Sequence, residues 1–94
     1  MSPLESIELL EATNTFPGPF MLKVIGRNED QFVDRVLVAV REALDLSLDP
    51  THSVRETAGG RHVAVTLEPW FENAETVLHA YQRLRALEGV VLLL

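Results

Sequence analysis

The sequence contains no cysteine, which excludes disulfide bonds and zinc sites built on thiolates. A chain without disulfides suits a reducing compartment, and we expect a cytoplasmic protein. No stretch approaches the roughly 20 consecutive apolar residues that a membrane-spanning helix needs. The first twelve residues are acidic and lack the basic segment of a secretory signal. These absences predict a soluble protein without a membrane partner.

Basic residues are few as well. Eight Lys and Arg residues stand against 14 Asp and Glu residues, which gives a formal net charge of −6. The basic side chains are scattered, whereas a protein that binds nucleic acid usually presents a basic patch to the phosphates. The acidic balance also disfavours contact with anionic lipid. We therefore expect no nucleic-acid partner.

The sequence also lacks a catalytic or metal-binding arrangement. Its histidines include no pair spaced i, i+4, as a metal site on a helix would need: His52, His62 and His79. Three carboxylates suit the dipole at a helix start better than acid–base catalysis: Glu29, Asp30 and Asp34. The hydroxyl side chains have no His–Asp partnership that would make a nucleophile: Ser47, Ser53 and Thr66. We expect no metal, no cofactor and no enzymatic activity.

What the sequence does contain is the pattern of a single small domain, residues 1–94, with an apolar fraction of 47%. Alternating and helical apolar periodicities predict six elements. In chain order they are a strand at Phe20–Ile25, a helix at Asn28–Leu44, hairpin strands at Thr51–Thr57 and Arg61–Glu68, a helix at Ala74–Glu88, and a strand at Val90–Leu94.

The stretch Phe16–Asn28 organises the chain, because it supplies a central strand and the start of a helix. Gly26 predicts the break after that strand. Asn28 predicts the N-cap of the helix, with Gln31 placed to complete a capping box. One apolar stripe of the helix is expected to face the core: Phe32, Val33, Val36, Leu37, Val40 and Leu44.

Gly59 and Gly60 predict a two-residue hairpin turn, which fixes the register of both hairpin strands. Four aliphatic residues then share the core face: Val54, Val63, Val65 and Leu67. His52 and His62 fall on opposite faces in this register. The other face is polar and is expected to contact water.

The segment after the hairpin carries two aromatic residues, Trp70 and Phe71, and two interpretations of them stay open. They form either a lid on the core or an apolar patch for a partner. Asn73 predicts the N-cap of the second helix, and Gly89 predicts its end.

The order strand, helix, strand, strand, helix, strand is the split βαβ pattern of ferredoxin-like α+β folds. Right-handed crossovers predict an antiparallel sheet of order 4-1-3-2, with both helices on one face. Residues 1–15 precede this unit as an N-terminal arm, in which Ser2 and Pro3 suit the start of a helix over residues 3–12. Such a short helix is unstable alone, so a docked helix and a frayed arm both stay open.

The last strand, Val90–Leu94, is expected at an edge of the sheet, yet it has no polar side chain. A bare apolar edge is a template for aggregation. We therefore predict that it is covered, either by the N-terminal arm or by the same strand of a second subunit. We favour a homodimer, because isologous dimers are the commonest oligomers.

Several short motifs carry a resemblance to a known family. They are the Leu-rich segment Ile7–Glu11, an aromatic-Pro-x-x-Phe turn at Phe16–Phe20, a Lys-Val-x-Gly strand end at Lys23–Gly26, and the terminal aliphatic strand. From Ile7 onward the chain resembles the YbeD-like family of small uncharacterised bacterial proteins. The resemblance implies an ACT-like ferredoxin fold and no established activity. The segment Glu68–Asn73 departs from the family pattern, and we assign it no role.

The resemblance also implies a likeness to regulatory domains that sense amino acids near the loop after the first strand, often at a dimer interface. In this chain that loop begins with Gly26, Arg27 and Asn28, which offer backbone N–H groups at a helix start and one guanidinium group. Our first hypothesis is a non-catalytic regulatory module that binds a small anionic metabolite, such as an amino acid, at these residues. The structural alternative is a tight turn, an exposed arginine and a helix cap.

The second hypothesis is a protein-interaction adaptor that uses the open sheet face or the edge strand. Its surface would include Met21, Lys23, Ile25 and Arg55, which the predicted strands place away from the helices. The ordinary alternative for Lys23 is a solvated side chain whose stem covers its neighbours. An enzyme ranks last, since it needs a polar constellation that the sequence lacks.

Overall fold

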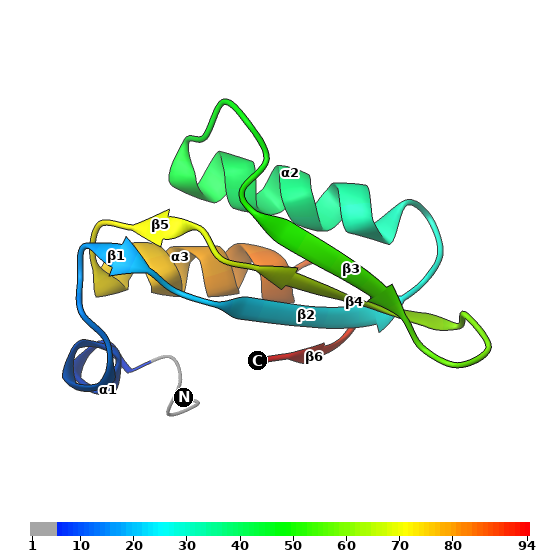
Figure 1. Ribbon diagram of the computed structural model, residues 1–94, viewed down its shortest axis with the longest axis horizontal. Helices are drawn as coiled ribbons and strands as arrows, with labels where there is room; N and C mark the ends of the chain where they lie inside the picture. Colours follow the sequence, from blue (N-terminus) through cyan, green and yellow to red (C-terminus); the bar gives the residue numbers. More distant parts are fainter. Residues whose placement is uncertain (1–5) are drawn as a thin grey trace.

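The computed structural model describes residues 6–94, and its main feature is a four-stranded antiparallel sheet. The strands are β2 (Leu22–Arg27), β3 (His52–Glu56), β4 (His62–Leu67) and β6 (Val90–Leu93). Their order across the sheet is β3-β4-β2-β6, so β3 and β6 are the two edge strands (Figure 1). Counted along the chain and read from β6, this order is 4-1-3-2.

Three helices and a second, two-stranded sheet complete the chain. The helices are α1 (Ile7–Thr13), α2 (Phe32–Leu44) and α3 (Ala74–Arg85), and the small sheet pairs β1 (Gly18–Pro19) with β5 (Trp70–Phe71). Helices α2 and α3 pack against each other and cover one face of the main sheet. The predicted α+β, ferredoxin-like class is confirmed, and the small sheet is an addition to the predicted elements.

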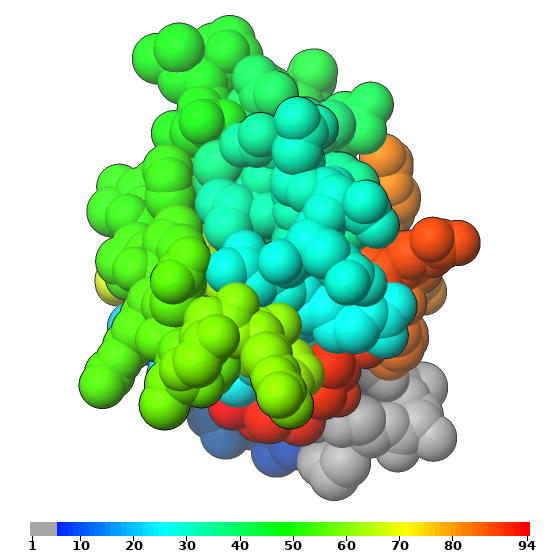
Figure 2. All heavy atoms as spheres, turned by 90° about the vertical axis from the view of Figure 1, so that its right-hand side faces the viewer, coloured from blue at the N-terminus to red at the C-terminus, as the bar shows by residue number. Residues whose placement is uncertain are grey.

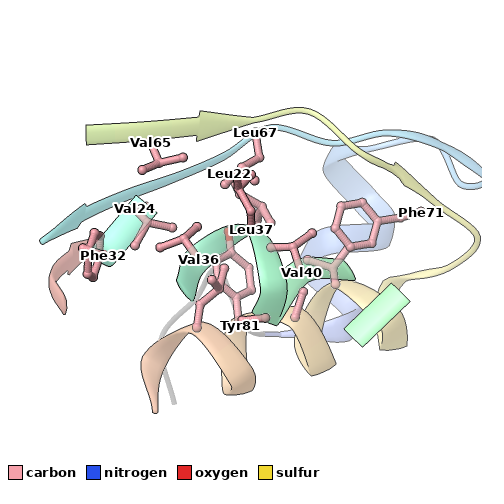
Figure 3. Close-up of a cluster of buried hydrophobic side chains, with 14 of the residues drawn as sticks. Leu22, Val24, Phe32, Val36, Leu37, Val40, Val65, Leu67, Phe71 and Tyr81 are labelled. Carbon is pink, nitrogen blue, oxygen red and sulfur yellow. The ribbon is translucent and has the colours of Figure 1, made fainter. Parts of the chain in front are cut away.

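The core lies between the main sheet and the helices α2 and α3. Leu22 and Val24 of β2 and Val65 and Leu67 of β4 are fully buried. Figure 3 shows these side chains pointing from the strands toward α2 and Tyr81 of α3. The predicted stripe of α2 is buried through its middle and half-buried at Val33 and Leu44, which pack against the core. Apolar periodicity therefore located the core correctly.

The hairpin has the predicted register. His52 lies opposite Leu67, and Val54 lies opposite Val65. The prediction that Val54 belongs to the core is wrong. Val54 lies on the helix side of β3, but its exposed fraction is 47%. Its strand is at the edge of the sheet, where no further strand covers it within residues 6–94.

Two boundaries around the first long strand differ from the prediction. β2 starts two residues later and continues through Gly26 to Arg27, so Gly26 does not break it. A Cβ atom at Gly26 would lie 2.3 Å from Cζ of Phe32, so the glycine leaves room for that ring. Helix α2 starts at Phe32, with Gln31 as N-cap, and not after Asn28. The prediction of Asn28 as N-cap is therefore wrong.

The described part of the N-terminal arm forms a docked helix. Ser6 caps α1 by accepting a hydrogen bond from the backbone N–H of Leu9, and Leu10 is buried where α1 meets α3. The predicted helix start at Ser2 and Pro3 lies outside the described residues. Burial of Leu10 explains why so short a helix is ordered, since isolated helices of this length are unstable.

The aromatic pair after the hairpin has two different environments. Phe71 is fully buried and meets the ring of Phe20 edge-on at 5.9 Å, whereas Trp70 is 59% exposed. The lid interpretation thus fits Phe71 alone. Asn73 caps α3 as predicted by accepting a hydrogen bond from the N–H of Thr76.

The C-terminal helix ends before its predicted boundary. α3 ends at Arg85 rather than Glu88, and Gly89 follows with a φ of +96° before β6 begins. In Figure 2, which shows the right-hand side of Figure 1, red atoms of the last strand reach the surface in the lower part of the view.

Candidate functional site

The corner predicted to bind an anion is occupied by contacts within the chain. The side-chain amide of Asn28 donates to Oε1 of Glu56 at 3.1 Å and to the carbonyl oxygen of Gly60 at 3.0 Å. Its backbone N–H donates to the carbonyl oxygen of Arg61 at 2.9 Å and so extends the β2–β4 ladder. Asn28 therefore clamps the hairpin turn onto the end of β2.

Arg27 also has a partner within the chain. Its Nε lies 2.9 Å from Oε1 of Glu29, and the two side chains are 55% and 57% exposed. The guanidinium group thus already contacts a carboxylate, and four residues separate Arg27 from the first residue of α2. The helix start that supported anion binding at Gly26, Arg27 and Asn28 is therefore elsewhere, and anion binding at this corner stays a prediction.

Arg35 is a structural residue that sequence reasoning missed. Its Nε donates to the carbonyl oxygen of Asp30 at 2.9 Å, and its Nη1 donates to that of Glu88 at 2.8 Å. The guanidinium carbon also lies 5.5 Å from the ring centre of Phe32. Arg35 thereby fastens the start of α2 to the turn before β6. Helical spacing alone puts it on the outer face, and no sequence signal points to a partner 53 residues away.

The second predicted surface is intact on the side of the sheet that the helices leave uncovered. The alternation along β2 directs Lys23 and Ile25 away from the core, and Arg55 of β3 shares their face. Met21, just before β2, is 60% exposed. We call the outward side of the four long strands the open sheet face. Lys23, Ile25 and Arg55 therefore lie on this face, with Ile25 half-buried, and Met21 lies just beyond the end of β2.

β6 extends the open sheet face with aliphatic side chains that were not included in the predicted surface. Leu92 lies opposite Ile25, and Leu94 exchanges backbone hydrogen bonds with Lys23 at 2.8 and 3.0 Å. One row across the sheet consequently consists of Arg55, Ala64, Ile25 and Leu92. The strand VVLLL signals an apolar edge in the sequence, but only the register tells which of its residues join this face.

The open sheet face differs from the rest of the molecule in charge. Glu56 is the only acidic residue in the four strands, and it lies opposite the buried Val63, on the helix side. Within residues 6–94, neither Lys23 nor Arg55 forms an ion pair. On this face of a chain of net charge −6, Lys23 and Arg55 thus lie beside aliphatic side chains with no ion pair to any residue of 6–94.

Comparison with known proteins identifies the family. The family model described as "Protein of unknown function (DUF493)" matches residues 11–94. The chain belongs to the DUF493 family. A relative from Shewanella halifaxensis (strain HAW-EB4), named UPF0250 protein, is 34% identical over 83 residues, which cover 88% of each chain. The resemblance to the YbeD-like family of uncharacterised proteins is thereby confirmed.

The family model matches a slightly shorter part of the chain than the resemblance from Ile7 onward. The matched region of this DUF493 domain starts at residue 11, so most of the Leu-rich segment Ile7–Glu11 precedes it. It runs through the Glu68–Asn73 segment, whose middle forms β5 against β1. The segment therefore has a structural role as the connection between β4 and α3.

Two hollows lie outside the open sheet face of the DUF493 domain. One, of about 360 Å³, lies between α2 and α3, with Val38, Ala39 and Leu87 among its lining residues. The other, of about 450 Å³, lies where the loop over residues 46–51 meets Pro69 and Trp70. Neither hollow includes Gly26, Arg27 or Asn28.

Within residues 6–94, no three His, Cys, Asp or Glu side chains are grouped as metal ligands would be. Burial raises the pKa of the Tyr81 phenol, so this side chain stays neutral at ordinary pH. The longest described helix has 13 residues, and none of those in residues 6–94 is long and apolar enough to cross a membrane.

Proposed function

We propose that this DUF493 domain is a non-catalytic adaptor that binds a segment of another protein on its open sheet face. One observation carries the proposal: Lys23 and Arg55 have no ion pair within residues 6–94, and they flank exposed aliphatic side chains on that face. Exposed patches that combine apolar area with one sign of charge are typical of protein-binding surfaces.

The chemistry of the surface defines the partner. Ile25 and Leu92 offer apolar area whose removal from water favours binding. Lys23 and Arg55 attract carboxylates and disfavour basic partners. We therefore expect a protein segment in which acidic side chains flank apolar ones. Because the charges lie around the aliphatic side chains, they should govern the association rate and selectivity more than the affinity.

This proposal reverses the order of the two sequence-based hypotheses, in which the small-anion module came first. The expected anion groups of Arg27 and Asn28 already contact Glu29, Glu56 and Gly60. Lys23 and Arg55, in contrast, have no such partner within residues 6–94. The adaptor is thus the function that the geometry supports better.

The test is photo-crosslinking in cells, with a photoreactive amino acid in place of Met21, which is highly exposed. We expect one dominant adduct with another protein. Ile25→Glu and Lys23→Glu should each reduce its yield about tenfold or more, since a hot-spot side chain contributes at least about 2 kcal/mol. Val38→Glu is the matched control, because Val38 is an exposed aliphatic residue on α2, on the helix side.

The outcomes separate the proposal from its alternatives. An adduct that survives both open-face substitutions, or that Val38→Glu reduces equally, contradicts docking on this face. The absence of any adduct contradicts the adaptor function. Thermal unfolding of each variant checks that a lost adduct does not reflect a lost fold.

A further inference from the structure

The outer edge of β6 lacks a partner within the described chain. β6 pairs with β2 on one side, and no strand of residues 6–94 pairs with its other side. Leu94 directs its N–H and C=O toward Lys23. Because these groups alternate in direction along an antiparallel strand, Leu93 directs its own outward. The edge therefore presents free backbone hydrogen-bonding groups.

The side chains of this edge are aliphatic on both faces of the sheet. Leu92 and Leu94 are 46% and 47% exposed on the open sheet face, and Val91 is 57% exposed. Val90 and Leu93 are half-buried and pack against the core on the helix side. The hydrophobic core thus extends to the edge strand β6, where its side chains are only partly buried.

The N-terminal arm was one expected cover for this edge. Its described part, helix α1, packs against α3 instead and buries Leu10 there. Val91, Leu92 and Leu94 keep their exposure with α1 in place. Something outside the described chain is therefore needed to remove this apolar edge from water.

We propose that the cover is a second copy of this chain, with its β6 paired antiparallel to the first across a two-fold axis. The two sheets then form one eight-stranded sheet. Helices α2 and α3 of both copies lie on one side of it. A two-fold axis places the residues next to it beside their own copies, and residues 90–94 include no charged side chain that would be set against itself.

The size of the edge also favours a second copy over a peptide strand. A stable interface usually buries about 800 Å² on each partner, more than four residues of strand supply. A second copy adds its own helix layer beside α3, whereas an isolated strand covers only the backbone. The half-buried Val90 and Leu93 on the helix side then gain apolar neighbours.

This proposal does not depend on the adaptor function. It would, however, join the two open sheet faces, so that Ile25, Leu92 and Leu94 of both copies form one central apolar band. Arg55, on β3, lies at the far edge of each sheet and would flank that band on both sides.

The absence of cysteine makes a single-cysteine scan the direct test. Val91, Leu92, Leu93 and Leu94 are each replaced by Cys, and the full chain is oxidised mildly at micromolar concentrations. We expect rapid disulfide formation at the position nearest the two-fold axis, because only there do the two Cβ atoms come close enough. Val54→Cys is the control, since Val54 on the other edge strand has the same 47% exposure as Leu94.

Sedimentation of the unmodified chain supplies the second measurement. We expect twice the 10.5 kDa of one chain, and a return to the monomer mass in Leu92→Lys. A wild-type monomer at micromolar concentrations overturns the proposal and leaves the edge to a different protein. A dimer that crosslinks through Val54→Cys as fast as through the β6 positions overturns the assigned interface. Failure of the adaptor test changes neither readout.

Discussion

All five residues of β3 are exposed and four of them are polar, whereas β6, at the other edge of the same sheet, is entirely aliphatic. The two edges meet the same physical problem, since each exposes backbone groups that can pair with another strand. Charged side chains such as Arg55 and Glu56 protect β3 from such pairing. β6 has no such protection. This difference between the two edges is why we propose a second copy at β6 and none at the edge of β3.

The largest loss of stability should come from a substitution in β2, the strand that pairs with β6. Gly26→Ala puts a Cβ atom within 2.3 to 2.7 Å of three ring atoms of Phe32, next to the point where Gly26 pairs with Val90. We expect a loss of about 3 kcal/mol in the free energy of unfolding, as overpacking in a core produces. Urea denaturation measures it.

The double variant with Phe32→Leu tests the cause of that loss. A smaller side chain makes room, so the combined loss should be less than the sum of the two single losses. Strictly additive losses would show that the ring of Phe32 does not account for the glycine.

The second prediction compares the edges directly. If β6 binds a second copy, the melting temperature rises with protein concentration, because association of folded chains stabilises them by mass action. Leu92→Lys should abolish this concentration dependence, and Val54→Lys should preserve it. Differential scanning calorimetry over a range of concentrations measures both. Equal behaviour of the two variants would remove the distinction between the edges.

The features that the sequence predicted are those set by neighbours in the chain. The predicted hairpin register is correct because a turn centred on Gly59 and Gly60 and a period of two leave one alignment. The turn itself is longer than the predicted two residues, since Thr57 donates its N–H to the carbonyl oxygen of His62. The apolar nature of the last strand is equally local. The placement of Lys23, Ile25 and Arg55 on one face of the sheet could therefore be anticipated, and their role in binding stays a prediction.

The features that the sequence did not predict depend on distant partners. Asn28 has the residue type of an N-cap, yet its amide binds groups 28 and 32 residues away, and α2 starts later. Gly26 has the residue type of a strand break, yet it lies within the strand and leaves room for the ring of Phe32. Arg35 fits a solvated helix face, yet it reaches Glu88. In each case a tertiary contact overrides a local preference.

The third prediction concerns what holds the β3 end of the sheet. Asn28→Ala removes two hydrogen bonds that fasten the hairpin turn, and we expect a loss of about 1 kcal/mol, the net value of such exposed bonds. Hydrogen exchange should accelerate at the backbone N–H groups of Thr57 and Gly60, which close that turn. The amides in the β2–β6 pairing should change much less. Uniform acceleration over both edges would contradict a local clamp.

The smallest effect is expected at Arg27 and Glu29, whose exposed ion pair lies at the end of β2, between the two edges. Glu29→Gln should alter the free energy of unfolding by less than about 0.5 kcal/mol, because exposed pairs gain little in water. The same variant frees the guanidinium of Arg27. If the corner binds carboxylates, amino acids should raise the melting temperature more in Glu29→Gln than in the wild type, and not at all in Arg27→Ala. A flat response in all three chains would contradict anion binding at this corner.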